Sequence, residues 1–113
     1  MKLLGIVTLL ISIYSLSANA KDRRFDHYIN MPYSTVRAGL ISEGWKVLTN
    51  KKILDSSFYA VGIFEQGYEE VLDCVSMERD QCQFVLAKNK QLIVITTKEK
   101  ALNVESIEIK NKH

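Results

Sequence analysis

Apolar and polar positions follow two different periods along the chain, one typical of a helix and the other of strands. In MPYSTVRAGLISEGW, apolar side chains recur at three- and four-residue spacing along one helical stripe, at Tyr33, Val36, Leu40 and Ile41. The proline before this stripe suits a first turn, and Gly44 suits the position just past the last turn. The pattern predicts a helix over residues 33–43.

From residue 71 onward, apolar residues alternate with polar ones, as in strands that bury one face. Strands are predicted over residues 71–75, 81–87, 91–97 and 104–109. Short polar turns between consecutive strands are typical of an antiparallel meander. The sequence therefore predicts an α+β domain, with an N-terminal helix packed on an antiparallel meander sheet of about four strands and one disulfide.

Two segments fit these periods poorly. Residues 21–30 are polar and mixed in charge, which predicts a loosely held arm. Residues 58–64, FYAVGIF, are rich in aromatic and β-branched side chains, which favours a strand. A short second helix that begins after Asp55 and ends at Gly67 is the alternative, and both interpretations stay open.

The first twenty residues have the features of a secretory signal peptide. Lys2 precedes an apolar run, and Ala18-Asn19-Ala20 offers small residues for cleavage after Ala20. The run of about 14 residues is short of the roughly 20 that span a bilayer, and no cysteine follows to carry a lipid, so we expect no stable membrane anchor. We expect an exported protein of the bacterial periplasm, with residues 21–113 as a single small domain.

The charge balance narrows the choice of partners. Loss of residues 1–20 removes Lys2 and leaves 14 Lys and Arg against 13 Asp and Glu, a net charge of +1. Nucleic-acid binding requires a strongly basic field, so we expect no nucleic-acid partner. The sequence does not specify the oligomeric state.

The two cysteines, Cys74 and Cys82, flank the loop between the predicted strands 71–75 and 81–87. An exported domain of this size favours a disulfide between them. A zinc site needs further ligands, and His27 and His113 lie in terminal segments; a thioredoxin-like pair has only two intervening residues. We therefore predict a disulfide across a hairpin, no metal and no cofactor. In the chain-entropy model, closing this loop contributes roughly 2.5 kcal/mol.

The loop between the cysteines contains Met77, Glu78, Arg79 and Asp80. A solvated turn is one interpretation of this composition. A rigid finger that contacts a partner is the other, because a disulfide at its base lowers the entropy lost on binding.

Arg37 lies inside the apolar arc of the predicted helix. Either its methylene stem covers the edge of the core while the guanidinium reaches water, or it pairs with a carboxylate such as Glu69, Glu70 or Asp73. Arg37 with Glu70 is the candidate structural ion pair.

No glycine-rich phosphate loop, nucleophile elbow or histidine motif is present in the sequence, so we expect no enzymatic activity.

The chain resembles small exported bacterial proteins of mostly unassigned function. The resemblance rests on five motifs taken together: Tyr33-x-x-x-Arg37-x-x-Leu40, Gly44-Trp45, Gly67-Tyr68-x-Glu70, Cys74/Cys82 and Leu92-x-Val94-x-Thr96. The helix-then-meander order is also similar to modules of envelope-assembly lipoproteins and of protein inhibitors of β-lactamase. This resemblance implies a protein-binding role. The chain departs from the lipoproteins in lacking an acylated cysteine.

The expected function is a non-catalytic periplasmic binding protein that inhibits an enzyme, in the manner of toxin-immunity proteins or lysozyme inhibitors. Its expected partner is a protein, such as a secreted or periplasmic hydrolase. The alternative is an envelope-assembly or structural accessory module that binds a larger protein complex.

Overall fold

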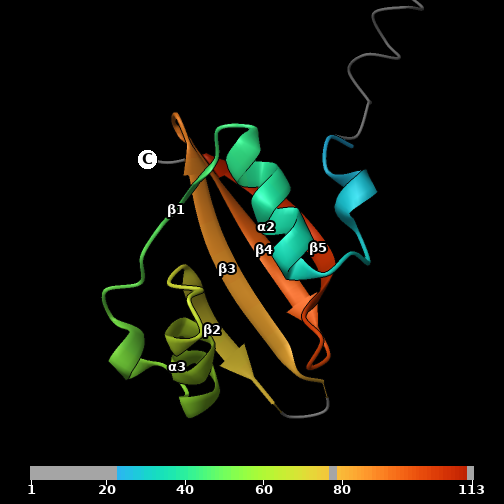
Figure 1. Ribbon diagram of the computed structural model, residues 1–113. Coiled ribbons are helices and arrows are strands. Elements are labelled where there is room, and N and C mark those ends of the chain that lie inside the picture. Colours follow the sequence, from blue (N-terminus) through green and yellow to red (C-terminus); the bar gives the residue numbers. More distant parts are fainter. Residues whose placement is uncertain (1–22, 77–78, 112–113) are drawn as a thin grey trace, which may run out of the picture.

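Within residues 23–76 and 79–111, two short α-helices and five antiparallel strands make up the fold (Figure 1). The structure, a computed structural model, describes residues 23–76 and 79–111. In chain order the elements are η1 (Asp26–Tyr28), α2 (Tyr33–Ser42), β1 (Lys46–Val47), η2 (Ile53–Asp55), α3 (Phe58–Glu65), β2 (Val71–Val75), β3 (Gln81–Lys88), β4 (Gln91–Lys98) and β5 (Asn103–Asn111). The predicted α+β class is confirmed, with a second helix and a fifth strand added.

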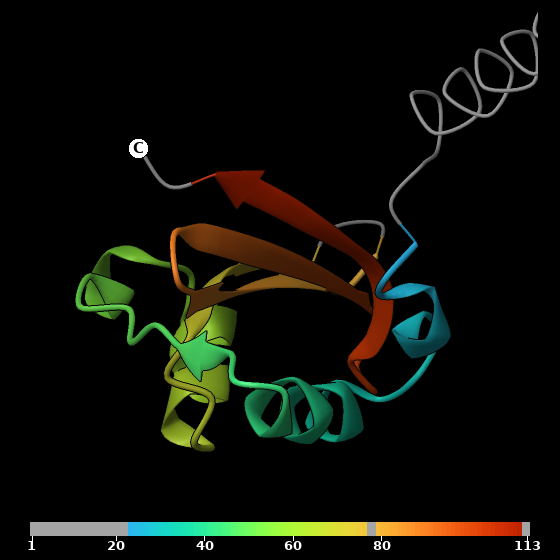
Figure 2. The same cartoon turned by 90° about the horizontal axis from the view of Figure 1, so that it is seen from above.

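The sheet has the order β1-β3-β4-β5, and β2 pairs with β3 on the same side as β1. The two-residue β1 lies opposite one end of β3, where Lys46 faces Ala87, and β2 lies opposite the other end, where Cys74 faces Cys82. β2 to β5 therefore form the predicted meander. Both α-helices lie on one side of the sheet (Figure 2), which gives a two-layer domain.

The core lies between the helices and the inner face of the sheet. Alternate strand residues are fully buried there because side chains point to opposite faces at a period of two: Cys82, Phe84, Leu86, Ile93, Ile95 and Thr97. From α2, the buried side chains are Tyr33, Val36 and Leu40. Ile41, which was predicted to share their stripe, is 44% exposed, because it lies at the margin of that arc.

The segment before α2 is packed against the core, so the prediction of a loose arm is wrong for residues 25–28. Phe25 and Tyr28 are both buried, and the Phe25 ring meets the edge of Trp45 with ring centroids 6.0 Å apart. The Tyr28 hydroxyl donates a hydrogen bond to the Glu43 carboxylate. Two aromatic side chains thus anchor a stretch whose average composition is polar.

Of the two interpretations left open for residues 58–64, the favoured strand is wrong and the short second helix is confirmed as α3, although its N-cap is Ser57 and not Asp55. The Ser57 hydroxyl accepts a hydrogen bond from the Ala60 N–H at 3.2 Å and caps its first turn. Gly67, at φ 110°, follows its end in the left-handed region that favours glycine. Ala60 and Ile63 are buried, so the turn chemistry and the packing together override strand propensity.

Two helical glycines provide a matched pair of substitutions. A Cβ atom at Gly39 would lie 2.5 Å from the Tyr28 hydroxyl oxygen, whereas a Cβ atom at Gly62 meets nothing within 4 Å. We expect Gly39→Ala to lower the free energy of unfolding by about 1–2 kcal/mol, because Tyr28 must move. Gly62→Ala should raise it by roughly 0.5–1 kcal/mol through helix propensity. Urea unfolding measures both changes, and equal effects at the two sites would contradict the packing of Tyr28 on α2.

Candidate functional site

The disulfide joins β2 to β3 at directly opposed positions. Cys74 and Cys82 have Cα atoms 4.0 Å apart, and both side chains are buried. The predicted cross-strand disulfide is confirmed. It lies at the base of the loop that was predicted to bind a partner, and it holds the two ends of that loop together.

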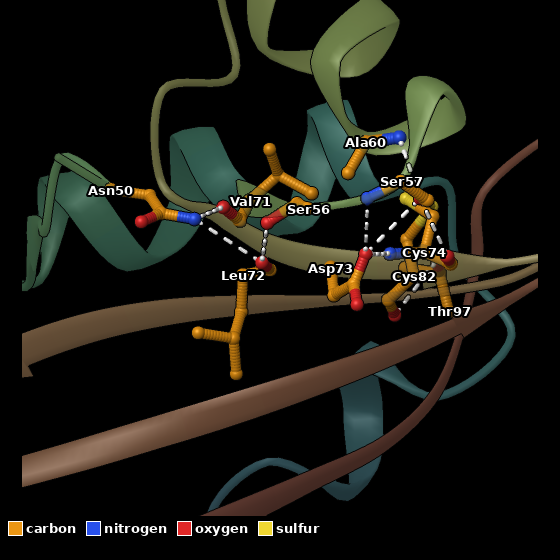
Figure 3. Close-up of a disulfide and its surroundings, with 10 residues drawn as sticks. All are labelled: Asn50, Ser56, Ser57, Ala60, Val71, Leu72, Asp73, Cys74, Cys82 and Thr97. Carbon is orange, nitrogen blue, oxygen red and sulfur yellow. Dashed lines mark hydrogen bonds between the residues drawn. A yellow bond between two sulfur atoms is a disulfide. The ribbon is translucent and has the colours of Figure 1, made fainter. Parts of the chain in front are cut away.

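Polar side chains from the segment before α3 line the outer edge of β2 (Figure 3). Asn50 Nδ2 donates to the carbonyl oxygens of Val71 and Leu72 at 3.0 and 3.2 Å, and Ser56 Oγ donates to Leu72 at 3.1 Å. Ser57 Oγ lies 2.8 Å from the Cys74 carbonyl oxygen. These contacts satisfy backbone acceptors that an edge strand otherwise exposes, and they fix α3 against the disulfide.

Asp73, one of the carboxylates considered for Arg37, lies instead beside the first turn of α3. Its Oδ1 accepts hydrogen bonds from the Ser57 N–H at 3.2 Å and the Cys74 N–H at 2.8 Å. The Ser57 backbone N–H is the main cause that lowers the pKa of Asp73. The charged form of Asp73 therefore helps to hold α3 to β2.

This contact predicts a pH dependence of stability. The pKa of Asp73 is lower in the folded protein than in the unfolded chain, so its charge stabilises the fold at pH values above about 3.9, the ordinary pKa of aspartate. This contribution is lost as the pH falls through the lowered pKa. Asp73→Asn should reduce the free energy of unfolding by about 1 kcal/mol at pH 7. Urea unfolding from pH 7 to pH 2 should show the difference shrinking below about pH 4. A difference that stays constant would rule out the charge on Asp73 as the cause.

The predicted contact residues divide into two groups. Met77 and Glu78 lie outside the described residues. Arg79 forms an ion pair with Glu105 of β5, and Gln81 Nε2 donates to the same carboxylate at 2.8 Å. Arg79 therefore ties the loop to the sheet, while Asp80 lies on the wall of an open cleft.

This cleft has a volume of about 730 Å³ and lies between α3, the loop and the β4–β5 turn. α3 contributes Tyr59 and Ile63, and its C-cap contributes Gln66. The loop and the β4–β5 turn contribute two residues each. We call it the loop-end cleft, and it is lined by Tyr59, Ile63, Gln66, Ser76, Asp80, Lys100 and Leu102. Apart from Asp80, the sequence did not single out these residues, because three separate segments bring them together.

The loop-end cleft combines an apolar centre with polar walls. Ile63 is buried, and Tyr59 and Leu102 are half-buried, while Lys100 is exposed. Burial, and then the charge of Asp80, raise the pKa of Tyr59, so its hydroxyl remains a neutral donor at physiological pH. Across the described ranges 23–76 and 79–111, no group of three or more His, Cys, Asp or Glu residues is placed to hold a metal ion. The arrangement suits the binding of a partner side chain or chain segment.

Arg37 and Glu70 meet in the core, where α2 approaches the end of β2. Arg37 Nε donates to Glu70 Oε2 at 2.6 Å, and Nη2 donates to Oε1 at 3.3 Å. The Tyr33 hydroxyl donates to Glu70 Oε2 at 2.6 Å. Glu69, the neighbouring carboxylate, is exposed and accepts a bond from Thr49 instead.

The surroundings of this network raise the pKa values of Tyr33 and Arg37. The Glu70 side chain is 0% exposed, while Arg37 is 27% exposed and its guanidinium lies 5.5 Å from the centre of the Tyr68 ring. Burial, followed by the charge of Glu70, raises the pKa of Tyr33, and the hydrogen bond to Glu70 raises the pKa of Arg37. Tyr33 also stacks on Phe84, with ring centroids 3.8 Å apart. The network therefore joins α2 to the residue before β2 and to β3.

The proposed signal peptide, residues 1–20, lies outside the described residues. Within residues 23–76 and 79–111, no helix is both long and apolar enough to span a membrane. No protein-family model, curated protein or solved structure matches this chain.

Proposed function

We propose that this chain is an exported, non-catalytic binding protein that inhibits an enzyme through its loop-end cleft. The observation that carries the proposal is the set of contacts that hold the described residues around the cleft. The disulfide joins the two ends of the loop, and Glu105 holds both Arg79 and Gln81 beside it. A surface ordered before binding loses less conformational entropy on association.

The composition of the cleft indicates the kind of contact. An apolar centre of Tyr59, Ile63 and Leu102 with charged residues around it is typical of a protein–protein interface, which has an apolar core and a polar rim. Asp80 suits a basic group of the partner, and Lys100 suits an acidic one. A projecting segment of a hydrolase, with an apolar side chain between charged neighbours, fits this arrangement.

The proposed location is the periplasm. The features of residues 1–20 favour export, and a disulfide persists in an oxidising compartment. Peptidoglycan hydrolases and secreted toxins act in the same space, so they are the enzymes to test first.

The experiment compares the mature chain with two variants. The cleft variant carries Tyr59→Ala, Asp80→Ser and Lys100→Ser, and the control carries Lys51→Ser and Asp55→Ser at exposed positions outside the cleft. Immobilised protein captures partners from periplasmic extract, and each captured hydrolase is assayed by the clearing of a cell-wall suspension.

We expect the wild type and the control to inhibit the captured enzyme, and the cleft variant to lose at least about tenfold in potency. Equal inhibition by all three proteins would rule out the cleft as the contact surface. Far-UV circular dichroism must be the same for all three, so that loss of potency reports on the cleft and not on folding.

A second candidate function, an envelope accessory module that binds a larger complex, is favoured by a different observation. Phe58 at the start of α3 is 96% exposed, and Leu54 in η2 is 85% exposed. Large exposed apolar side chains so close in sequence are typical of protein contact sites. If Phe58→Ser with Leu54→Ser abolishes capture while the cleft variant does not, the accessory role is the better description.

A further inference from the structure

Among the described residues, backbone partners cover the outer edge of β5 only over its first residues. The backbone N–H of Asn30 donates to Val104 at 2.7 Å, Val104 donates back to Met31 at 2.8 Å, and Tyr33 donates to Leu102 at 2.8 Å. Beyond Val104, β5 pairs with β4 alone within the part of the chain that the structure describes. Figure 2 shows β5 at the rim of the sheet, where it runs away from both helices.

The opposite edge of the sheet is closed. Side chains of Asn50, Ser56 and Ser57 bind the outward carbonyl groups of β2, and β1 is only two residues long. Folded proteins usually block their edge strands in such ways, because an open edge pairs readily with another strand. The second half of β5 therefore contrasts with the rest of the sheet perimeter.

The charges on this half strand are arranged for pairing with an identical strand. Glu108 lies opposite Val94, and Lys110 lies opposite Leu92, so both are on the sheet face away from the helices, and both are exposed. When two copies pair antiparallel about Ile109, Glu108 of each copy lies opposite Lys110 of the other. A pairing centred on Glu108 or on Lys110 would instead place like charges opposite each other, which is unfavourable.

We propose that residues 107–111 of β5 form a self-pairing edge, whose occupant is a second copy of this chain. The two-fold axis passes beside Ile109 and stands perpendicular to the sheet, so the helices of both copies lie on the same side. The two sheets join into one, with two Glu108–Lys110 pairs across the junction. Lys100 and Leu102 of the loop-end cleft lie at the other end of β5, so the cleft stays accessible in the dimer.

Charge reversal tests this register without altering the core. Sedimentation velocity of the mature wild type should show a monomer–dimer equilibrium. Glu108→Lys and Lys110→Glu should each weaken self-association by about tenfold or more, because each places like charges across the junction. The double exchange, Glu108→Lys with Lys110→Glu, should restore it. An equimolar mixture of the two single variants should form a heterodimer.

Two outcomes would overturn the proposal: a wild type that stays monomeric up to about 1 mM, or single variants that dimerise as well as the wild type. Failure of the double exchange to restore dimerisation would overturn the register as well. Thermal unfolding of each variant at low concentration should match that of the wild type, because both side chains are exposed.

Discussion

Arg37→Met is expected to lower the free energy of unfolding by roughly 3–5 kcal/mol. Methionine keeps most of the apolar stem of Arg37 but removes the guanidinium that pairs with Glu70. The Glu70 side chain is completely buried, so its carboxylate would keep the Tyr33 hydroxyl as its side-chain partner and lose its counter-charge. Urea unfolding, followed by the fluorescence of Trp45, the single tryptophan, measures the loss.

A control replaces the whole network instead of one member. Tyr33→Phe, Arg37→Met and Glu70→Met together leave no buried polar group without a partner, so we expect this triple variant to recover most of the stability. If Arg37→Met alone costs less than about 1 kcal/mol, water reaches Glu70 and the network is not a buried ion pair. If the triple variant is as unstable as the single one, packing rather than charge explains the loss.

Removal of the disulfide is the second substitution with a large expected effect. Cys74→Ala with Cys82→Ala should lower the free energy of unfolding by about 2.5 kcal/mol, because the unfolded chain regains the entropy of a loop of about nine residues. Loss of two buried sulfur atoms adds to this cost. Urea unfolding with and without dithiothreitol measures the effect.

Reduction provides the internal control for this prediction. Dithiothreitol should bring the wild type close to the stability of the double variant and should leave the double variant unchanged. Capture of a partner through the loop-end cleft should also weaken in the double variant, although no residue lining the cleft has changed. Equal stability of the oxidised wild type and the variant would contradict the stabilising role of the disulfide.

Local patterns accounted for the elements whose neighbours in sequence are also neighbours in space. α2 and the meander follow from hydrophobic period and from polar turns between consecutive strands. The disulfide follows from the same hairpin, since Cys74 and Cys82 flank a loop between strands that pair directly. In each case a few residues contain the signal, so the sequence by itself determined the α+β class and the cysteine pairing.

Where packing competes with propensity, only the tertiary structure decided. The composition of residues 58–64 favours a strand. Helix α3 forms instead, because Ser57 caps its first turn and also binds the Cys74 carbonyl group at the outer edge of β2. Phe25 and Tyr28 are anchored by contacts with Trp45 and Glu43, far along the chain. No local pattern contains these two long-range contacts, whereas the Ser57 cap of α3 is a local signal.

In the candidate site, too, some features follow from the local sequence and others from long-range packing. The sequence left open whether Arg37 reaches water or pairs with a carboxylate, and it named Glu70 as the candidate. The tertiary structure places Glu70 against Arg37, Glu69 in solvent and Asp73 beside α3. The loop-end cleft is assembled from α3, the disulfide loop and the β4–β5 turn. Its residues converge only after long-range packing. The sequence determined the disulfide that holds the loop, and the tertiary structure decided what lies beside it.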